Sequence, residues 1–238
     1  MDNNDIKIIE DFNKWRSDHG VTMPELVTMI GTTNSSTLFL TEEHAKRFTK
    51  LLNSIERHNC SKKEKGKILE ELINYLFTEC HSKILDCRLN QRTSTNEIDL
   101  LLSWTEEARF SSFTNLLPVF VNSFLCECKN YNGKVGVTYI GKFYSLLKVS
   151  NSKLGILISW EGVTGRNDWT DAKGLIKKIA LKDDIYIIAL DKNDLYEIGN
   201  RKTHIFNIVN KKYTSLQNDI DYSKYINPHE NEELFSSL

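Results

Sequence analysis

Two continuous apolar runs in the second half of the chain constrain the fold more than any other feature. They are "LGILISW" (154–160) and "DIYIIAL" (184–190), and the helix-like "WTDAKGLIKKIAL" (169–181) lies between them. Short apolar runs without polar alternation are typical of strands that are buried on both faces of a sheet. We therefore expect a strand, a helix and a second strand, in a sheet that helices cover on two sides.

The residues before these runs predict three more strands. "KILDCRL" (83–89) and "EIDLLLS" (97–103) flank the turn-prone "NQRTSTN", which indicates a β-hairpin. "PVFVNSFLCECK" (118–129) is a third strand region, and "TYIGKFYSLLKV" (138–149) is the helix that follows it. The order helix, three strands, helix, strand, helix, strand predicts an α/β sandwich with a central mixed β-sheet flanked by helices.

We expect three regions along the chain, namely a helical N-terminal accessory region (1–60), an α/β domain (61–200), and a C-terminal helix with an acidic tail (201–238). In the first region Pro24 can open a short helix, and Thr41 can cap a later one. Ser61 and Glu64 form a capping-box pattern ahead of "GKILEELINYLF" (66–77), which predicts the first helix of the α/β domain.

Charge is balanced overall but uneven along the chain. The 238 residues carry a formal net charge of −1, yet nine basic residues against three acidic ones fall between Lys129 and Lys178. A local basic face, more than net charge, decides whether a protein binds nucleic acid. No window approaches ~18 apolar residues, and the acidic N-terminus is not typical of a secretory signal, so we expect a cytoplasmic protein without a membrane segment.

The stretch "FLCECKNYN" (124–132) offers two candidate sites at the end of the third strand. Because alternate residues of a strand face opposite sides, Cys126 and Cys128 share one face while Glu127 and Lys129 share the other. Free cysteines are among the most buried residue types, so we interpret the cysteine pair as core packing. The alternative, a zinc site, needs two more ligands, and the nearby candidates match no familiar zinc spacing (Cys80, His81, Cys87).

An acidic residue inside a neighbouring apolar strand favours the glutamate and lysine as the site. Asp99 is followed by three leucines, and pairing of the two strands would bring it beside Glu127. Two close carboxylates repel each other unless one is protonated or a cation lies between them, and oxygen ligands of this kind suit Mg²⁺ or Mn²⁺. With Lys129 on the same face, the set supports phosphodiester hydrolysis. The alternative is a surface ion pair at a strand end.

These motifs resemble the PD-(D/E)xK nuclease superfamily, and most closely its Mrr-type restriction endonucleases. The resemblance covers about residues 61–200 and rests on four stretches in this order: "GKILEELINYLF" with Glu70 four residues after Gly66, "NEIDLLL" with Asp99, "FLCECKN" with Glu127 and Lys129, and "KLGILISWEGVTG". It implies a restriction-endonuclease-like fold and a Mg²⁺- or Mn²⁺-dependent endonuclease that acts on DNA in restriction or anti-phage defence.

The resemblance also implies a role for each site residue. Asp99 and Glu127 would ligate the metal with the backbone carbonyl of Cys128, Lys129 would serve the attacking water, and Glu70 would assist, with Glu71 as second choice. The basic stretch would contact the DNA backbone through three lysines (Lys134, Lys142, Lys153). Expected partners are DNA, a second copy of the chain to cut both strands, and a companion defence protein.

Three departures from the family pattern bear on the hairpin and the substrate. Ile98 replaces the proline of the motif, "STNEID" has no glycine before its aspartate, and "WTEEARFSSFTNLLP" lengthens the segment between Asp99 and Glu127. Two other functions therefore stay open: a structure-specific resolvase or repair nuclease with the same chemistry, and a catalytically silent nucleic-acid-binding module.

Overall fold

The computed structural model describes most of the chain, namely residues 3–22, 25, 38–56, 61–92, 97–110, 123–129, 133–166 and 170–218. The chain divides into two units, 1–39 and 40–238, and each is described by itself. The first unit contains helix α1 (Asn3–Asp18), which lies in the N-terminal region expected to be helical. Its Phe12, Trp15 and His19 rings follow one another along an exposed face. The short helix expected at Pro24 lies outside the described residues.

The second unit is built on one five-stranded sheet in the order β1-β2-β3-β4-β5. The strands are β1 (Leu85–Arg92), β2 (Glu97–Trp104), β3 (Ser123–Lys129), β4 (Leu154–Ser159) and β5 (Tyr186–Leu190). β1, β2 and β3 pair antiparallel, whereas β3, β4 and β5 pair parallel. The sheet is therefore mixed, and both the hairpin and the two late buried strands are confirmed.

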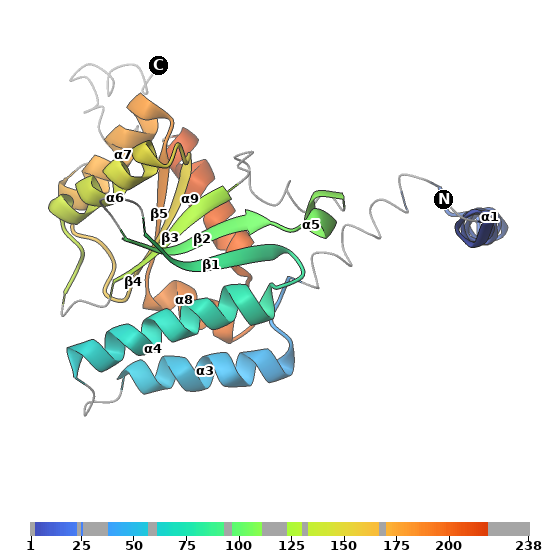
Figure 1. Ribbon diagram of the computed structural model, residues 1–238, viewed down its shortest axis with the longest axis horizontal. Coiled ribbons are helices and arrows are strands. Elements are labelled where there is room, and N and C mark those ends of the chain that lie inside the picture. The colour runs from blue at the N-terminus through green and yellow to red at the C-terminus, as the bar shows by residue number, and fades with distance from the viewer. Residues whose placement is uncertain are drawn as a thin grey trace, which may run out of the picture. The chain divides into compact units, whose positions relative to one another are not determined.

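Helices cover the sheet on both faces, as Figure 1 shows. Helices α6 (Val137–Val149) and α7 (Asp171–Asp183) lie on one face, where they share an apolar core with Leu125, Leu157 and Ile187 of the strands. Helix α4 (Lys62–Tyr75) lies on the other face, with α3 (Glu42–Glu56) packed against it. Helix α9 (Ile205–Asn218) contributes Phe206, which stacks on Trp104 of β2. Among the described residues, no helix combines the length and apolar character that crossing a membrane requires.

Local capping explains several helix starts. The Ser61 hydroxyl accepts from the Glu64 backbone while the Glu64 carboxylate accepts from the Ser61 backbone, which confirms the expected capping box of α4. The sequence reasoning missed α8 (Lys192–Gly199), although Asp191 and Asp194 form the same kind of box at its start. It also missed the short α5 (Glu106–Phe110).

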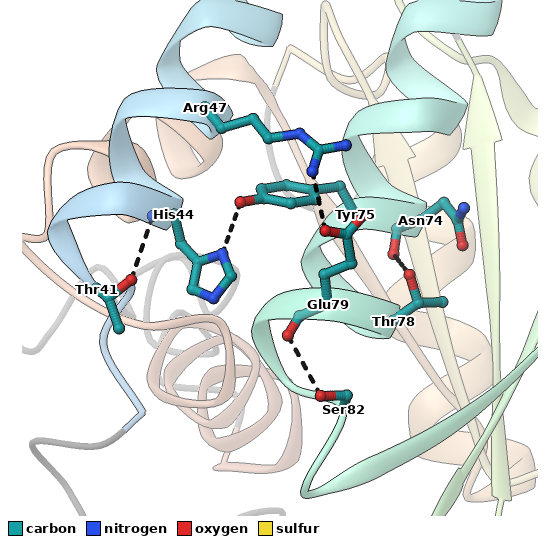
Figure 2. Close-up of polar contacts among 8 residues, drawn as sticks. All are labelled: Thr41, His44, Arg47, Asn74, Tyr75, Thr78, Glu79 and Ser82. Atoms are coloured by element: carbon teal, nitrogen blue, oxygen red, sulfur yellow. Dashed lines mark hydrogen bonds and ion pairs between the residues drawn. The ribbon is translucent and has the colours of Figure 1, made fainter.

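A polar cluster joins α3 to the end of α4, where a π-helical turn (Leu76–Cys80, η1) follows (Figure 2). The Arg47 guanidinium lies 4.2 Å from the centre of the Tyr75 ring and 2.9 Å from the Glu79 carboxylate. The Tyr75 hydroxyl and His44 Nδ1 are 2.6 Å apart, and burial raises the pKa of Tyr75 to about 12. These contacts attach α3 to the sheet domain, while the boundary at residue 60 stays a prediction.

Candidate active site

The alternation of side chains along β3 separates the two residue pairs of "FLCECKNYN" (124–132). Leu125 belongs to the core beneath α6 and α7, whereas the Phe124 ring lies against Trp104 on the other face. Cys126 and Cys128 are 0% and 5% exposed, so the structure confirms them as buried packing residues. Glu127 shares the face of Leu125 and is directed toward α6, so the two pairs serve opposite sides of the sheet.

Glu127 is a buried carboxylate at the end of β3, with only 7% of its surface exposed. Its Oε1 lies 2.7 Å from the Lys129 ammonium and also accepts a short hydrogen bond from the Tyr139 hydroxyl. Its Oε2 is buried and has no hydrogen-bond partner within the described part of the chain. Leaving a buried polar atom unpaired costs about 1–3 kcal/mol, and more when the group is charged. Such an atom calls for a ligand or a functional reason.

The neighbouring strand brings the backbone of Asp99 to the same end of the sheet. Leu100 of β2 pairs with Cys126 of β3. Because the strands are antiparallel, Asp99 and Glu127 are the next residues of their strands beyond this pair. The described side chains do not include that of Asp99, so its approach to Glu127 stays a prediction that the backbone register supports.

The remaining predicted residues fall into two groups. Lys134 and Lys142 are both exposed. Both lie at the end of the sheet that carries Glu127, because Lys134 precedes the Val135–Val163 bridge and Lys142 follows Tyr139 by one helical turn. Lys153 lies at the other end of the sheet. It precedes β4, whereas Lys129 pairs with Ser159 at the last residue of β4, a separation of about 20 Å along the strand.

Lys153 is also engaged with a neighbouring turn, since its ammonium lies 3.7 Å from the Asp184 carboxylate and donates to the Asp183 carbonyl at 3.3 Å. Glu70 lies on α4, on the face of the sheet opposite to α6, and its side chain is exposed. Glu71 is exposed as well. The assisting role of Glu70 stays a prediction.

Tyr139 is the site residue that sequence reasoning missed. It lies in the first turn of α6, and the centre of its ring is 5.0 Å from the Lys129 ammonium. The Trp160 backbone donates to the Lys129 carbonyl at 3.3 Å, which extends the pairing of β3 with β4 by one residue. The one signal in the sequence was a tyrosine at the start of the helix that follows the motif, next to the apolar Ile140.

The residues present fit a divalent cation. A buried carboxylate oxygen without a partner, with a second carboxylate on the adjacent strand, supplies the hard oxygen ligands that Mg²⁺ and Mn²⁺ prefer. Among the described side chains, which exclude Asp99, no group of three or more His, Cys, Asp or Glu residues could hold a metal. The described cysteines, which suggested a zinc site in the sequence, are covered by this finding.

A mixed sheet between helices, with a buried Glu-x-Lys at the end of its third strand, defines the class of PD-(D/E)xK nucleases. Residues 61–198 match the family model of the Mrr catalytic domain, described as restriction endonuclease. The chain therefore belongs to the Mrr-type restriction endonuclease family.

Comparisons with solved structures and with curated sequences say less about the family than the family model does. The DNA modification-dependent restriction endonuclease AspBHI is similar to 78% of this chain, at 12% identity and with a TM-score of 0.36. This chain spans 43% of that protein. No curated protein sequence matches the chain.

Proposed function

We propose that the protein is a divalent-metal-dependent endonuclease that hydrolyses phosphodiester bonds of DNA, in the restriction of foreign DNA. One observation carries this proposal: Glu127 is buried with Oε1 held by Lys129 and Tyr139, while Oε2 has no partner among the described residues. A buried ion pair adds little to stability once the cost of desolvation is counted. The arrangement is therefore better explained by chemistry at the site than by folding.

The roles of the side chains follow from their charges. Glu127 Oε2 and Asp99 would hold Mg²⁺ or Mn²⁺, with the carbonyl of Cys128 assisting. When bound, the ion supplies Lewis-acid polarisation of the scissile phosphate. Lys129 orients the attacking water and stabilises the negative charge that builds on the phosphate oxygens. The side chain of Lys129 is 22% exposed, so the residue is partly accessible from solvent.

The surface beside the site supports a nucleic-acid substrate. Lys134 and Lys142 are exposed at the same end of the sheet and would neutralise phosphates of the DNA backbone. Lys153 is not part of this proposed DNA-contacting track of lysines, because it lies at the opposite end of β4. Cutting both strands requires two sites, so we propose that two copies of the chain act together on one duplex. A companion defence protein would bind outside these residues.

The test is plasmid cleavage with Mg²⁺ or Mn²⁺ by the full chain, with Lys129→Ala and Asp99→Ala as variants. We expect the wild type to cut and each variant to lose at least about a hundredfold in rate, because Lys129→Ala removes a positive charge at the reacting phosphate and Asp99→Ala removes a proposed ligand of the metal. Cleavage that survives both substitutions would refute the site. If no linear, supercoiled or branched DNA is cut and Mn²⁺ does not bind, the protein is a silent module. Cutting of branched DNA alone would indicate a resolvase.

A further inference from the structure

Tyr139 contacts both charged groups of the proposed site at once. Its hydroxyl donates to Glu127 Oε1, and its ring centre lies 5.0 Å from the Lys129 ammonium. We propose that Tyr139 is a positioning residue with two separable actions: its hydroxyl orients Glu127 for the metal, and its ring holds Lys129. This inference rests on the proposed function, because it concerns the same site.

The position of the tyrosine is fixed by the start of α6. The strand-like pairing of Val135 with Val163 holds the segment before the helix, and the Tyr139 and Ile140 backbones both donate to the Gly136 carbonyl. Ile140 is fully buried, so α6 cannot rotate without disrupting the core beneath it. The Tyr139 ring is therefore held at a fixed place relative to the end of β3.

The hydrogen-bonding pattern explains why the hydroxyl matters for a metal. Both donors, the Lys129 ammonium and the Tyr139 hydroxyl, approach Oε1 of Glu127. A carboxylate held at one oxygen by two donors cannot turn freely, so Oε2 stays directed away from them. Outer-shell partners of this kind orient metal ligands, and their loss typically weakens metal binding by roughly 10–100-fold.

The ring has a different role. The face of an aromatic ring attracts a nearby ammonium, so Tyr139 can hold Lys129 even when Glu127 is engaged with a cation. Phenylalanine at position 139 keeps this contact and loses the hydroxyl, whereas leucine loses both. The two variants therefore separate an effect on metal binding from an effect on the lysine.

The same helix offers a matched control with the same three chemical groups. The Tyr144 hydroxyl donates to Asp183 at 3.0 Å, and the Lys148 ammonium lies 3.2 Å from the same carboxylate and 5.7 Å from the Tyr144 ring centre. This trio joins α6 to the last turn of α7, away from Glu127. Tyr144→Phe removes an equivalent hydroxyl without touching the proposed site.

The experiment measures Mn²⁺ binding to the full chain by titration calorimetry without DNA, together with DNA cleavage as a function of Mn²⁺ concentration. We expect Tyr139→Phe to weaken Mn²⁺ binding roughly tenfold, and its cleavage rate to recover at saturating Mn²⁺. Tyr139→Leu should show the same loss of affinity and a lower maximal rate, because Lys129 is no longer held. Tyr144→Phe should match the wild type. Thermal unfolding of each variant checks that it is folded.

Three outcomes would overturn the inference, and they are distinguishable. If Tyr139→Phe binds Mn²⁺ as tightly as the wild type while Mn²⁺-dependent cleavage persists, the positioning role is wrong and the proposed function stands. If the wild type neither binds Mn²⁺ nor cuts DNA, both are wrong. An equal loss of Mn²⁺ affinity in Tyr144→Phe would show a general effect of α6, and would also overturn the role of Tyr139.

Discussion

A buried histidine makes the stability of the protein depend on pH. His81 follows the π-helical turn and is 3% exposed, with its ring edge-on to Phe206 at 5.3 Å. Its Nδ1 has no hydrogen-bond partner among the described residues. Burial, together with the charges of the nearby His204 and His44, lowers the pKa of His81 to about 4. The folded protein therefore holds this ring neutral.

The sign and the size of the effect follow from the two protonation states. In the unfolded chain a histidine titrates near about 6.5, so below that pH the unfolded state binds a proton that the folded state does not. The free energy of unfolding therefore falls as the pH drops from about 6.5 toward about 4, where His81 also becomes protonated in the folded state. The difference between a pKa of about 6.5 in the unfolded chain and about 4 in the folded protein corresponds to about 3 kcal/mol in full, and to about 2 kcal/mol between about pH 8 and about pH 5.

The assay is urea unfolding of the wild type and of His81→Phe at several pH values between about 5 and about 8. Phenylalanine keeps an aromatic ring against Phe206 and removes the titrating group. We expect the difference in unfolding free energy between the two proteins to shift by about 2 kcal/mol in favour of the variant at the acidic end. His19→Gln, at an exposed position just after α1, is the control. If the wild type and His81→Phe lose stability in parallel as the pH falls, the reasoning about His81 is refuted.

Two further predictions concern packing and DNA binding. A Cβ at position 155 would lie 2.7 Å from Phe143 Cε1 and 2.8 Å from Leu147 Cδ1, so Gly155→Ala should destabilise the protein by about 1–3 kcal/mol in urea unfolding. Gly141→Ala, where a Cβ meets nothing within 4 Å, should instead stabilise α6 by about 0.5–1 kcal/mol, and equal losses would contradict this account. Lys134→Ala and Lys142→Ala should each reduce by about 1 the slope of log affinity against log salt, measured by fluorescence anisotropy with duplex DNA. Lys182→Ala, in the last turn of α7, should leave that slope unchanged, and an equal reduction there would show that no local track exists.

The sequence predicted the features that depend on local pattern. Strand alternation separated Glu127 from Cys126 and Cys128, and apolar runs identified β4 and β5. Helix α8 was not predicted because it is only 8 residues long and carries a short apolar pattern, although its capping residue Asp191 is visible in the sequence. Residue patterns within single strands and helices were therefore enough to predict most of the fold.

Contacts between different helices and strands could not be predicted from the sequence. Tyr139 reaches Glu127 only because α6 packs across the end of β3, and no spacing in the chain encodes that crossing. Lys153 belongs to the basic stretch by sequence, yet the parallel pairing of β3 and β4 places it at the far end of the sheet from Lys129. The face of α4 that carries Glu70 likewise depends on how the helix docks. Distances across the fold, and not residue types, decide which candidates meet.

The central claim is that Glu127 serves a metal-dependent reaction, and the most direct test is the rate of plasmid nicking in Mg²⁺ by Glu127→Gln. The amide keeps the size of the side chain and removes the charge that a cation requires, so we expect a loss of at least about a hundredfold. Glu161→Gln is the matched control, because Glu161 is an exposed glutamate 3.3 Å from Lys192, and it should nick at the wild-type rate. Nicking by Glu127→Gln at the wild-type rate would contradict the account.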